Sequence, residues 1–416
     1  MALTGLRCKE CKAEYPIDAR YFCEQCFGPL EVSYDFGGLD PAEARRKIQA
    51  GSAGIWRYAD FLPFEAGPPP ERSALEPGLT PLIRASRLAE RLGLGEVWVK
   101  NDAANPTHSF KDRVVAIAIA KARELGFETV ACASTGNLAN AVAAHAAAAG
   151  LSSYVFVPAD LEEQKLLATG VYGTHLVGVR GSYDDVNRLC TELSEARPWA
   201  FVNVNLRPYY AEGSKTLAYE TIEQLGWELP DRVVCPIASG SLFTRLGRAF
   251  DEWLELGLAS GERPAFNGAQ PTGCDPVAEA FAAGRDVVKP QRPDTIAKSL
   301  AIGDPADGPY AVELARASGG AIDSVTDDEV RAGIRLLAET TGIFTETAGG
   351  VTTAVLAKLA ERGEIGADER VVVYITGDGL KTLDAVRDDH HAYAIDASIE
   401  SFEEGVADQT TTGARA

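Results

Sequence analysis

The chain has 416 residues, enough for more than one domain, and its 46% apolar and 24% charged residues are ordinary for a globular protein. Sixty acidic residues against 40 basic ones give a formal net charge of −20, which disfavours a broad nucleic-acid surface and any anionic membrane surface. No apolar stretch reaches the roughly 18 residues of a membrane span, and residues 1–10 lack an apolar signal core, so we expect a cytoplasmic protein.

Four cysteines near the amino end form two closely spaced pairs, Cys8-x2-Cys11 and Cys23-x2-Cys26. Each pair can present two thiolates to one tetrahedral ion, so together they predict a structural zinc site in a small ribbon over residues 1–34. Two disulfides or four free thiols are the alternatives, and a cytosolic setting makes disulfides rare. Because all four ligands would be sulfur atoms, no position is left open for a substrate, and the predicted metal serves to fold the ribbon.

The section after the ribbon shows little regular patterning. Alternating apolar and polar residues at 31–34 predict a strand that closes the ribbon, whereas residues 35–77 are predicted to be irregular and residues 67–70, Gly-Pro-Pro-Pro, to form a loop or linker. A helical pattern at residues 88–92 and a strand at residues 96–100 follow. That strand leads into a polar segment at residues 105–113.

From residue 129 onward, apolar runs of strand length alternate with helical patterns. This alternation predicts an α/β fold, in which parallel sheets are flanked by helices and ligands bind beyond the carboxyl ends of the strands. The pattern leaves the strand order open. The predicted strands are residues 129–132, 154–157, 176–179, 201–204, 233–237, 265–270, 322–325 and 371–375, and the predicted helices are residues 138–149, 161–168, 184–195 and 213–225.

The polar segment at residues 105–113 carries the strongest candidate for chemistry, Lys111. Ser109 and Asp112 stand three residues apart just before an apolar run, which is the spacing of a capping box that opens a helix. Lys111 is therefore expected in the first turn of a helix, where the positive end of the helix dipole does not stabilise a cation. A lysine in that setting suits a nucleophile that attacks a carbonyl group.

Three further segments follow predicted strands and place small or polar residues at the start of a helix or turn. Backbone amides and hydroxyl groups at such places bind anions, and an ordinary turn is the alternative for each segment. The segments are Ser134-Thr135-Gly136-Asn137, Ser239-Gly240-Ser241-Leu242 and Thr376-Gly377-Asp378-Gly379-Leu380-Lys381.

In their order and spacing, Lys111 and these segments resemble the motifs of the threonine synthases, a group of pyridoxal-phosphate enzymes of fold type II. The resemblance runs from about residue 5 to residue 385 and includes the zinc ribbon, which some bacterial and archaeal threonine synthases carry. It implies a catalytic region over residues 35–395 in which two parallel-sheet α/β domains enclose the cofactor, the smaller at about residues 110–215. Residues 396–416 are expected to form a disordered tail. The chain departs from the usual pattern at His108 and Val114, where the family has glycine, and at Asp378, where it has histidine.

The resemblance also implies roles for individual residues. Lys111 would carry pyridoxal phosphate and move protons on the substrate, Asn137 would contact the ring hydroxyl of the cofactor, and Thr376 would contact its pyridine nitrogen. The cofactor's phosphate would be held by Ser239, Gly240, Ser241 and Leu242, and the substrate's carboxylate by Ser134, Thr135, Gly136 and Asn137.

Two basic residues are candidates for the substrate's phosphate, Arg207 and Lys215. The family usually places its arginine a few positions after Arg207, where this chain has Tyr210, and a surface position is the alternative for both basic residues. His145 lies in an alanine-rich helical pattern and is expected to be packed and not catalytic.

The activity that the resemblance implies is the conversion of O-phospho-L-homoserine and water to L-threonine and phosphate, by an enzyme that is often a homodimer. A related replacement or elimination enzyme, such as a cysteate synthase or a threonine dehydratase, is one alternative. A zinc-ribbon binding module on a catalytically silent scaffold is another.

Overall fold

The computed structural model describes residues 2–65, 67–69, 72–134, 136–159, 161, 163–181, 183–389 and 392–404. Contacts divide the chain into two units, residues 1–381 and residues 382–416. The short 3-10 helix η5 (Gly379–Asp389) runs from the first unit into the second, which also contains α14 (Ile399–Phe402). Within the described part of the chain, every helix is too short or too polar to cross a membrane.

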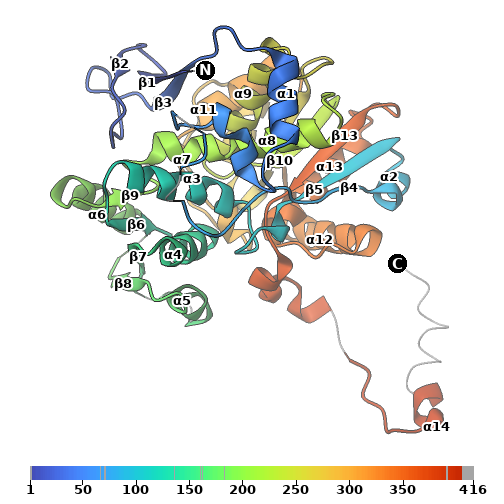
Figure 1. Cartoon of the computed structure of the whole chain (residues 1–416). Helices are drawn as coiled ribbons and strands as arrows, with labels where there is room; N and C mark the ends of the chain where they lie inside the picture. The colour runs from blue at the N-terminus through green and yellow to red at the C-terminus, as the bar shows by residue number, and fades with distance from the viewer. Residues whose placement is uncertain are drawn as a thin grey trace. The chain divides into compact units, whose positions relative to one another are not determined.

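The amino-terminal segment folds into a three-stranded antiparallel sheet with the order β2-β1-β3 (Figure 1). Its strands are β1 (Ala2–Cys8), β2 (Glu14–Tyr15) and β3 (Leu30–Asp35), so the strand predicted at residues 31–34 is confirmed. The apolar side chains inside it are few, since Leu6, Leu30 and Val32 are its buried aliphatic residues. We call residues 2–35 the ribbon.

The prediction of an irregular section at residues 35–77 is wrong, because it contains α1 (Pro41–Gln49) and the 3-10 helix η1 (Ile55–Phe61). Asp40 caps α1, since its carboxylate accepts hydrogen bonds from the amides of Ala42 and Glu43. Only Ile48 of α1 is buried, so the helix lacks the apolar periodicity by which it could have been recognised.

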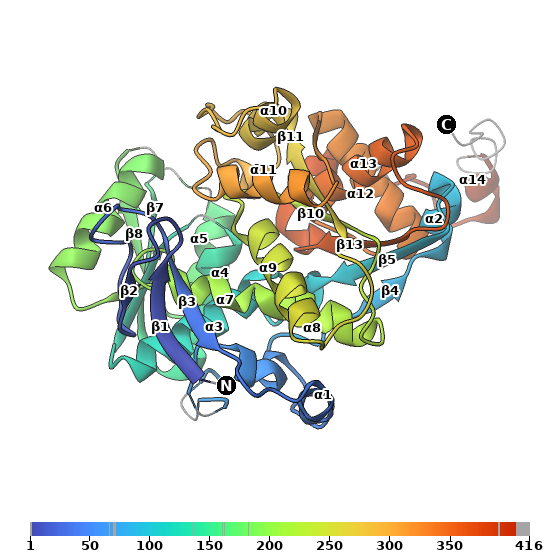
Figure 2. The ribbon, with the colours of Figure 1, turned by 90° about the horizontal axis from the view of Figure 1, so that it is seen from above.

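The larger sheet has six strands in the order β12-β11-β10-β13-β5-β4, parallel except for β4 at the edge. Helices α12 and α13 lie on one side of this sheet and α8 and α9 on the other (Figure 2). The strands are β4 (Leu82–Arg84), β5 (Glu96–Asn101), β10 (Arg232–Pro236), β11 (Ala265–Pro271), β12 (Ile322–Val325) and β13 (Arg370–Ile375). The associated helices are α2 (Ser86–Leu92), α8 (Lys215–Gln224), α9 (Ser241–Glu255), α10 (Pro276–Ala282), α11 (Gly308–Ala317), α12 (Asp327–Thr341) and α13 (Thr347–Glu361).

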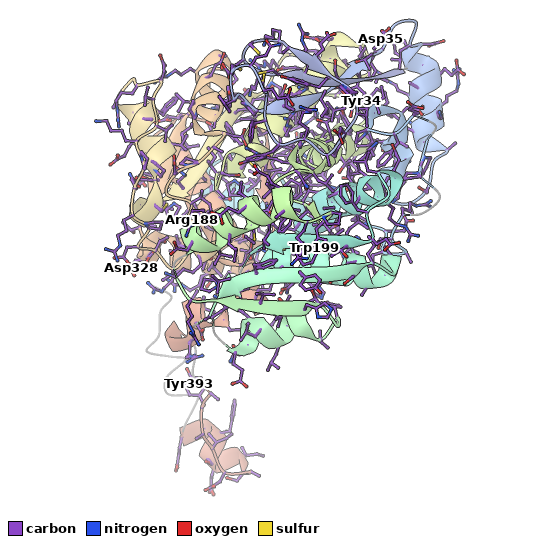
Figure 3. All side chains as sticks on the ribbon, turned by 90° about the vertical axis from the view of Figure 1, so that its left-hand side faces the viewer. Tyr34, Asp35, Arg188, Trp199, Asp328 and Tyr393 are labelled. Carbon is purple, nitrogen blue, oxygen red and sulfur yellow. The ribbon has the colours of Figure 1, made fainter. Side chains whose placement is uncertain are left out.

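The smaller sheet has four parallel strands in the order β8-β7-β6-β9. Trp199 lies beside this sheet, just before β9 (Figure 3). Its ring stacks on that of Tyr154 of β7, with ring centroids 4.4 Å apart. The predicted strand at residues 201–204 is wrong beyond its first residue, because the chain turns there and Leu206 donates a backbone hydrogen bond to Phe201. The strands are β6 (Thr129–Ala133), β7 (Ser152–Pro158), β8 (His175–Val179) and β9 (Ala200–Phe201), and the helices are α3 (Lys111–Glu124), α4 (Asn137–Ala149), α5 (Glu163–Gly170), α6 (Tyr183–Ala196) and α7 (Arg207–Gly213).

The two sheets confirm the predicted α/β class with parallel sheets. Helix α3 is buried on every side from Asp112 to Ala122, as expected of a helix whose apolar residues are not confined to one face. The carboxyl ends of β5, β6, β10 and β13 each lead into one of the four segments that the sequence marks as candidates for a site. In parallel sheets this is the edge at which ligands bind.

Candidate functional site

Lys111 is the first residue of α3, as predicted, but the capping box is wrong. The residue before the helix is Phe110, whose side chain makes no capping hydrogen bond, and the Ser109 hydroxyl accepts only a long hydrogen bond of 3.4 Å from the amide of Lys111. The carboxylate of Asp112 instead accepts hydrogen bonds from the backbone amide and the hydroxyl of Thr107, at 2.8 and 2.9 Å. Asp112 therefore links the first turn of the helix to Thr107, in the loop that precedes the helix.

The residues that follow Lys111 are locked in place by buried partners. Asp112 also contacts Nε2 of the fully buried His145, at 3.1 Å, so this histidine is packed and supports the loop. Arg113 is fully buried and makes paired hydrogen bonds to the carboxylates of Asp102 and Glu220, at 2.7 to 2.9 Å. Burial lowers the pKa of Arg113, but these two carboxylates raise it well above its usual value. The backbone at Lys111 is therefore held rigidly on its carboxyl-terminal side.

The two departures from the family pattern beside Lys111 have structural explanations. His108 has a φ of 60°, in the left-handed region where glycine carries no steric penalty. Val114 lies against Gly213 of α7, and a Cβ atom on Gly213 would lie 2.6 Å from the Cα atom of Val114 and from the carbonyl oxygen of Arg113. In this chain, the glycine that lets α3 and α7 approach closely is therefore on α7.

Tyr210 of α7 is the polar side chain in contact with the Lys111 amine. The Lys111 Nζ atom donates a hydrogen bond to the Tyr210 hydroxyl at 3.2 Å, and Tyr210 is 9% exposed. Sequence reasoning noted Tyr210 only as the residue that stands where the family has an arginine, and it assigned the tyrosine no role.

Asn137, the first residue of α4, is held between two charged side chains that sequence reasoning did not assign. Its Nδ2 atom donates to both carboxylate oxygens of Glu346, at 2.9 and 3.1 Å, and its Oδ1 atom accepts from the Lys381 ammonium at 2.8 Å. Lys381 also donates to the carbonyl oxygen of Thr107 at 2.6 Å. Ser134 and Gly136 precede Asn137 in the same loop, and Thr135 lies outside the described residues.

Glu346 is 3% exposed and lies beside the loop that follows β13. Burial raises the pKa of its carboxyl group, opposed by the hydrogen bond from Asn137 and by the charges of Lys381 and Lys111. None of the sequence motifs described above includes Glu346.

The loop after β13 joins the Lys111 loop through the backbone. The amide of Phe110 donates to the carbonyl oxygen of Thr376 at 2.9 Å, and the amide of Asp378 donates to that of His108 at 3.2 Å. Thr376 is 8% exposed. The structure thus brings the loops of Lys111, Asn137 and Thr376 together at the carboxyl ends of three strands.

The segment after β10 forms the amino end of α9, as predicted. Gly240 has a φ of 91°, and a Cβ atom on it would lie 2.8 Å from the backbone of Asp307, so only glycine fits. The amide of Asp307 in turn donates to the carbonyl oxygen of Ser239 at 2.8 Å. No described side chain caps α9, so the amides at its start, including those of Ser241 and Leu242, are suited to an anion such as a phosphate.

The two candidate ligands of the substrate's phosphate have different surroundings. Arg207 is 25% exposed and pairs with Asp307 at 2.7 Å. Because the amide of Asp307 donates to the carbonyl oxygen of Ser239, Arg207 lies near the start of α9. Lys215 is fully buried, with its ammonium 2.8 Å from Glu212 and 3.1 Å from Glu252. Two carboxylates already neutralise Lys215 inside the protein, and this does not favour binding of a substrate's phosphate.

The sulfur atoms of Cys8, Cys11, Cys23 and Cys26 all lie within 4.8 Å of one another. The closest pairs are Cys8 with Cys26 and Cys11 with Cys23, each at 3.5 Å. Four thiolates at the usual zinc–sulfur distance of a tetrahedral site are about 3.8 Å apart. The cluster therefore fits a structural zinc ion. Cys8 and Cys11 lie at one turn of the ribbon, and Cys23 and Cys26 at another.

Comparisons with known proteins agree with this geometry. A family described as "Pyridoxal-phosphate dependent enzyme" matches residues 74–377. A threonine synthase of Methanocaldococcus jannaschii is 36% identical over 381 residues, covering 91% of this chain and 93% of the relative. A threonine synthase of Methanosarcina acetivorans is 36% identical over 405 residues, covering 96% and 98%.

Solved structures share the fold at low sequence identity. The processed form of threonine deaminase isoform 2 from Solanum lycopersicum has a TM-score of 0.65 at 20% identity, over 86% of this chain and 96% of that one. Maize serine racemase has a TM-score of 0.61 at 20% identity, over 75% and 94%. These similarities establish the fold of the catalytic region.

Proposed function

This chain belongs to the pyridoxal-phosphate dependent enzymes and, within them, to the threonine synthases, and from this premise we propose that it converts O-phospho-L-homoserine and water to L-threonine and phosphate. The observation that carries the proposal is the 36% identity to threonine synthases over more than nine-tenths of the chain. The meeting of the Lys111, Asn137 and Thr376 loops supports it, because these are the residues to which cofactor contacts are ascribed.

The residues present fit pyridoxal phosphate. Lys111 would hold the cofactor through its amine, Asn137 would donate to the ring hydroxyl, and Thr376 would contact the pyridine nitrogen. The cofactor's phosphate would lie at the glycine-lined start of α9, held by Ser239, Gly240, Ser241 and Leu242. When bound, the cofactor supplies an electron sink conjugated with the α-carbon of the substrate.

The substrate would be oriented by the loop that opens α4. We propose that Ser134, Thr135, Gly136 and Asn137 bind its carboxylate through amides and hydroxyl groups at a helix start. Arg207 is the better candidate for its phosphate, because its guanidinium is partly exposed beside the start of α9. Lys215 stays a prediction from sequence that its buried ion pairs do not support.

Proton transfer would fall to Lys111. Its Nζ atom would remove protons from the α- and β-carbons of the substrate and deliver protons to the γ- and α-carbons, while the γ-phosphate leaves and the hydroxyl group of water becomes attached to the β-carbon. The Tyr210 hydroxyl would hold the amine between these transfers, since it already accepts a hydrogen bond from it. The hydroxyl group of one water molecule goes to the β-carbon and its remaining proton to the released phosphate, so the overall reaction takes up no proton.

We also propose that the ribbon holds one structural zinc ion through Cys8, Cys11, Cys23 and Cys26. The protein would act in the cytoplasm, since no described helix could cross a membrane and the metal ligands are thiols. A homodimer remains a proposal from the family resemblance.

The test is the release of phosphate and threonine from O-phosphohomoserine by the purified, cofactor-loaded protein. We expect equal amounts of both products, and we expect none from Lys111→Ala, whereas Lys289→Ala, at an exposed position, should match the wild type. If the protein binds the cofactor but releases neither product, the proposed substrate is wrong. L-threonine alone, and phosphoserine with sulfite, would then be the substrates to assay.

A further inference from the structure

The ribbon is the one motif of the sequence that the proposed reaction does not use. We propose that Glu31 of the ribbon is a positioning residue that holds α9, so that the start of this helix presents Gly240 and Ser241 to the cofactor's phosphate. This inference rests on the proposed function, because it assigns the phosphate of pyridoxal phosphate to α9.

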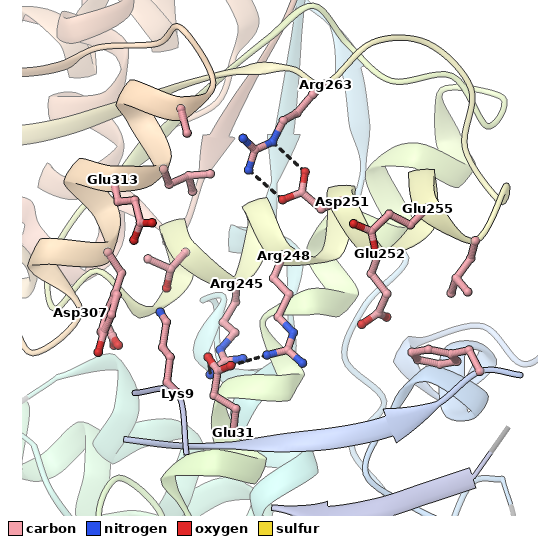
Figure 4. Close-up of a pocket in the computed structure, with 16 residues that line it drawn as sticks. Lys9, Glu31, Arg245, Arg248, Asp251, Glu252, Glu255, Arg263, Asp307 and Glu313 are labelled. Atoms are coloured by element: carbon pink, nitrogen blue, oxygen red, sulfur yellow. Dashed lines mark hydrogen bonds and ion pairs between the residues drawn. The ribbon is translucent and has the colours of Figure 1, made fainter. Parts of the chain in front are cut away.

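Glu31 forms the central contact. Its carboxylate pairs with Arg245 at 3.0 Å and with Arg248 at 2.5 Å, one and two turns into α9 (Figure 4). Arg248 also donates to the backbone carbonyl of Val32 at 3.3 Å. Burial raises the pKa of Glu31, but the two guanidinium groups lower it to about 2, so the carboxylate is charged throughout the working pH range. Both arginines are therefore fixed to one strand of the ribbon.

A second contact leads from the ribbon to the Lys111 amine. The Tyr34 hydroxyl donates to the carboxylate of Glu212 in α7 at 2.7 Å. The Tyr209 hydroxyl accepts from the amide of Asp18 at 3.0 Å and donates to the carbonyl oxygen of the same residue at 2.8 Å. Both Tyr209 and Glu212 are in the short helix that carries Tyr210, the partner of the Lys111 amine.

A third contact leads to the loop that supports the start of α9. The Lys9 ammonium lies 3.2 Å from the centroid of the Tyr310 ring, and the Tyr310 hydroxyl donates to Glu10. Tyr310 is in the first turn of α11, and this helix begins directly after Asp307. The amide of Asp307 donates a hydrogen bond to the carbonyl oxygen of Ser239.

Residues of the first and third contacts line a cavity of about 500 Å³ between the ribbon, α9 and α11. The three contacts reach three elements of the proposed cofactor site, namely the helix α9 one and two turns from its start, α7, and the segment that follows Asp307. Lys9 and Glu10 lie between Cys8 and Cys11, so an ion bound by the cysteines would fix the third contact as well. A ribbon that only covered apolar surface would not need buried ion pairs directed at these segments.

The proposal is tested by the cofactor affinity of the full-length protein. Pyridoxal phosphate is titrated into cofactor-free wild type, Glu31→Gln and Glu31→Asp, the absorbance of the bound form is followed, and the thermal unfolding of each protein is recorded. We expect Glu31→Gln to raise the dissociation constant about 3- to 30-fold, and Glu31→Asp to recover part of the affinity.

Asp251→Asn is the matched control. Asp251 pairs with Arg263 at 2.7 Å, from the same helix and at the same cavity, but this ion pair involves no residue of the ribbon (Figure 4). We expect Asp251→Asn to change the affinity less than about twofold, because this partly exposed ion pair does not connect α9 to the ribbon.

The proposal is wrong if Glu31→Gln and Asp251→Asn lower the unfolding temperature alike while neither changes the dissociation constant. If Glu31→Gln does not fold, Arg248→Gln, which removes one of the two guanidinium partners of Glu31, decides the matter: weaker cofactor binding supports the proposal and unchanged binding overturns it. A wild-type protein that binds no pyridoxal phosphate contradicts the proposed function itself, and this inference with it.

Discussion

Tyr210 is the side chain that most directly affects the candidate nucleophile. Its hydroxyl accepts a hydrogen bond from Lys111 Nζ at 3.2 Å. A hydrogen bond to a charged group contributes about 1.5–3 kcal/mol, so Tyr210→Phe should lower kcat roughly 10- to 100-fold while the bound cofactor keeps its absorbance. Tyr374→Phe is the control, because that buried hydroxyl contacts Thr221 and lies away from Lys111. A full rate for Tyr210→Phe would exclude a role in holding the amine.

Lys381 fixes which way the Asn137 amide faces. Its ammonium binds the Oδ1 atom, so the Nδ2 atom donates to Glu346 and, in the proposed site, would also donate to an oxygen of the cofactor. Lys381→Met should free the amide to turn, shift the absorbance spectrum of the bound cofactor and lower kcat about tenfold. Lys381→Arg should largely keep the wild-type spectrum and the wild-type kcat. Identical spectra for wild type and Lys381→Met would show that the amide is oriented by other groups.

Glu346 should make the stability of the cofactor-free protein depend on pH. Because burial raises its pKa, the folded protein keeps the proton at pH values where the unfolded chain has lost it. The free energy of unfolding therefore falls as the pH rises from the usual carboxyl pKa through the raised one. Glu346→Gln lacks this loss, so its melting temperature relative to the wild type should be higher at pH 8 than at pH 5. A difference that is constant with pH would contradict this assignment.

At the scale of elements, the approach of α3 to α7 decides whether Tyr210 reaches Lys111. Gly213→Ala would place a Cβ atom 2.6 Å from the backbone of α3, which cannot move aside as the end of a side chain can. We expect a loss of about 1–3 kcal/mol in the free energy of unfolding, and a lower kcat because α7 shifts away from Lys111. Gly170→Ala in α5 is the control, since its new Cβ atom would meet only the end of the Leu176 side chain, at 3.2 Å.

The sequence predicts the interior of this fold well because the central strands of its larger sheet are buried on both faces. β10 and β13 appear as unbroken apolar runs, and such runs need no alternation to be recognised. The sequence does not reveal α1, because a single buried residue gives no helical periodicity of apolar residues. Residues 202–204 resemble a strand in their composition, although the chain turns there after β9 ends at Phe201.

Some residues of the candidate site could likewise be predicted from the sequence, and others could not. Lys111, Asn137 and Thr376 follow strands in recognisable loops, so their approach to one another could be predicted. Tyr210 lies in the middle of α7 and Glu346 directly precedes α13, their packing depends on contacts distant in sequence, and no local pattern marks them. The partner of Asp112 was misassigned because spacing alone does not reveal that Thr107 is closer to its carboxylate than the amide of Ser109.

At the scale of the whole molecule, the metal site should control whether the ribbon stays folded. The ribbon buries few aliphatic side chains, too few to fold a sheet of this size without a metal or a crosslink. Cys11→Ser should abolish binding of a single zinc ion per chain, measured by metal analysis, and should make residues 1–34 the first segment cut in limited proteolysis. Cys190→Ser, at a buried cysteine outside the cluster, should change neither.

The effect of metal loss on cofactor affinity distinguishes two hypotheses about the role of the ribbon. If the ribbon positions the cofactor's phosphate segment, Cys11→Ser should bind pyridoxal phosphate more weakly by about the factor found for Glu31→Gln, and combining both changes should add little, because both break one path. If the ribbon is an independent appendage, proteolysis will remove residues 1–34 while cofactor affinity and kcat stay at the wild-type level. Measuring cofactor affinity before and after this cleavage, on one preparation, distinguishes the two.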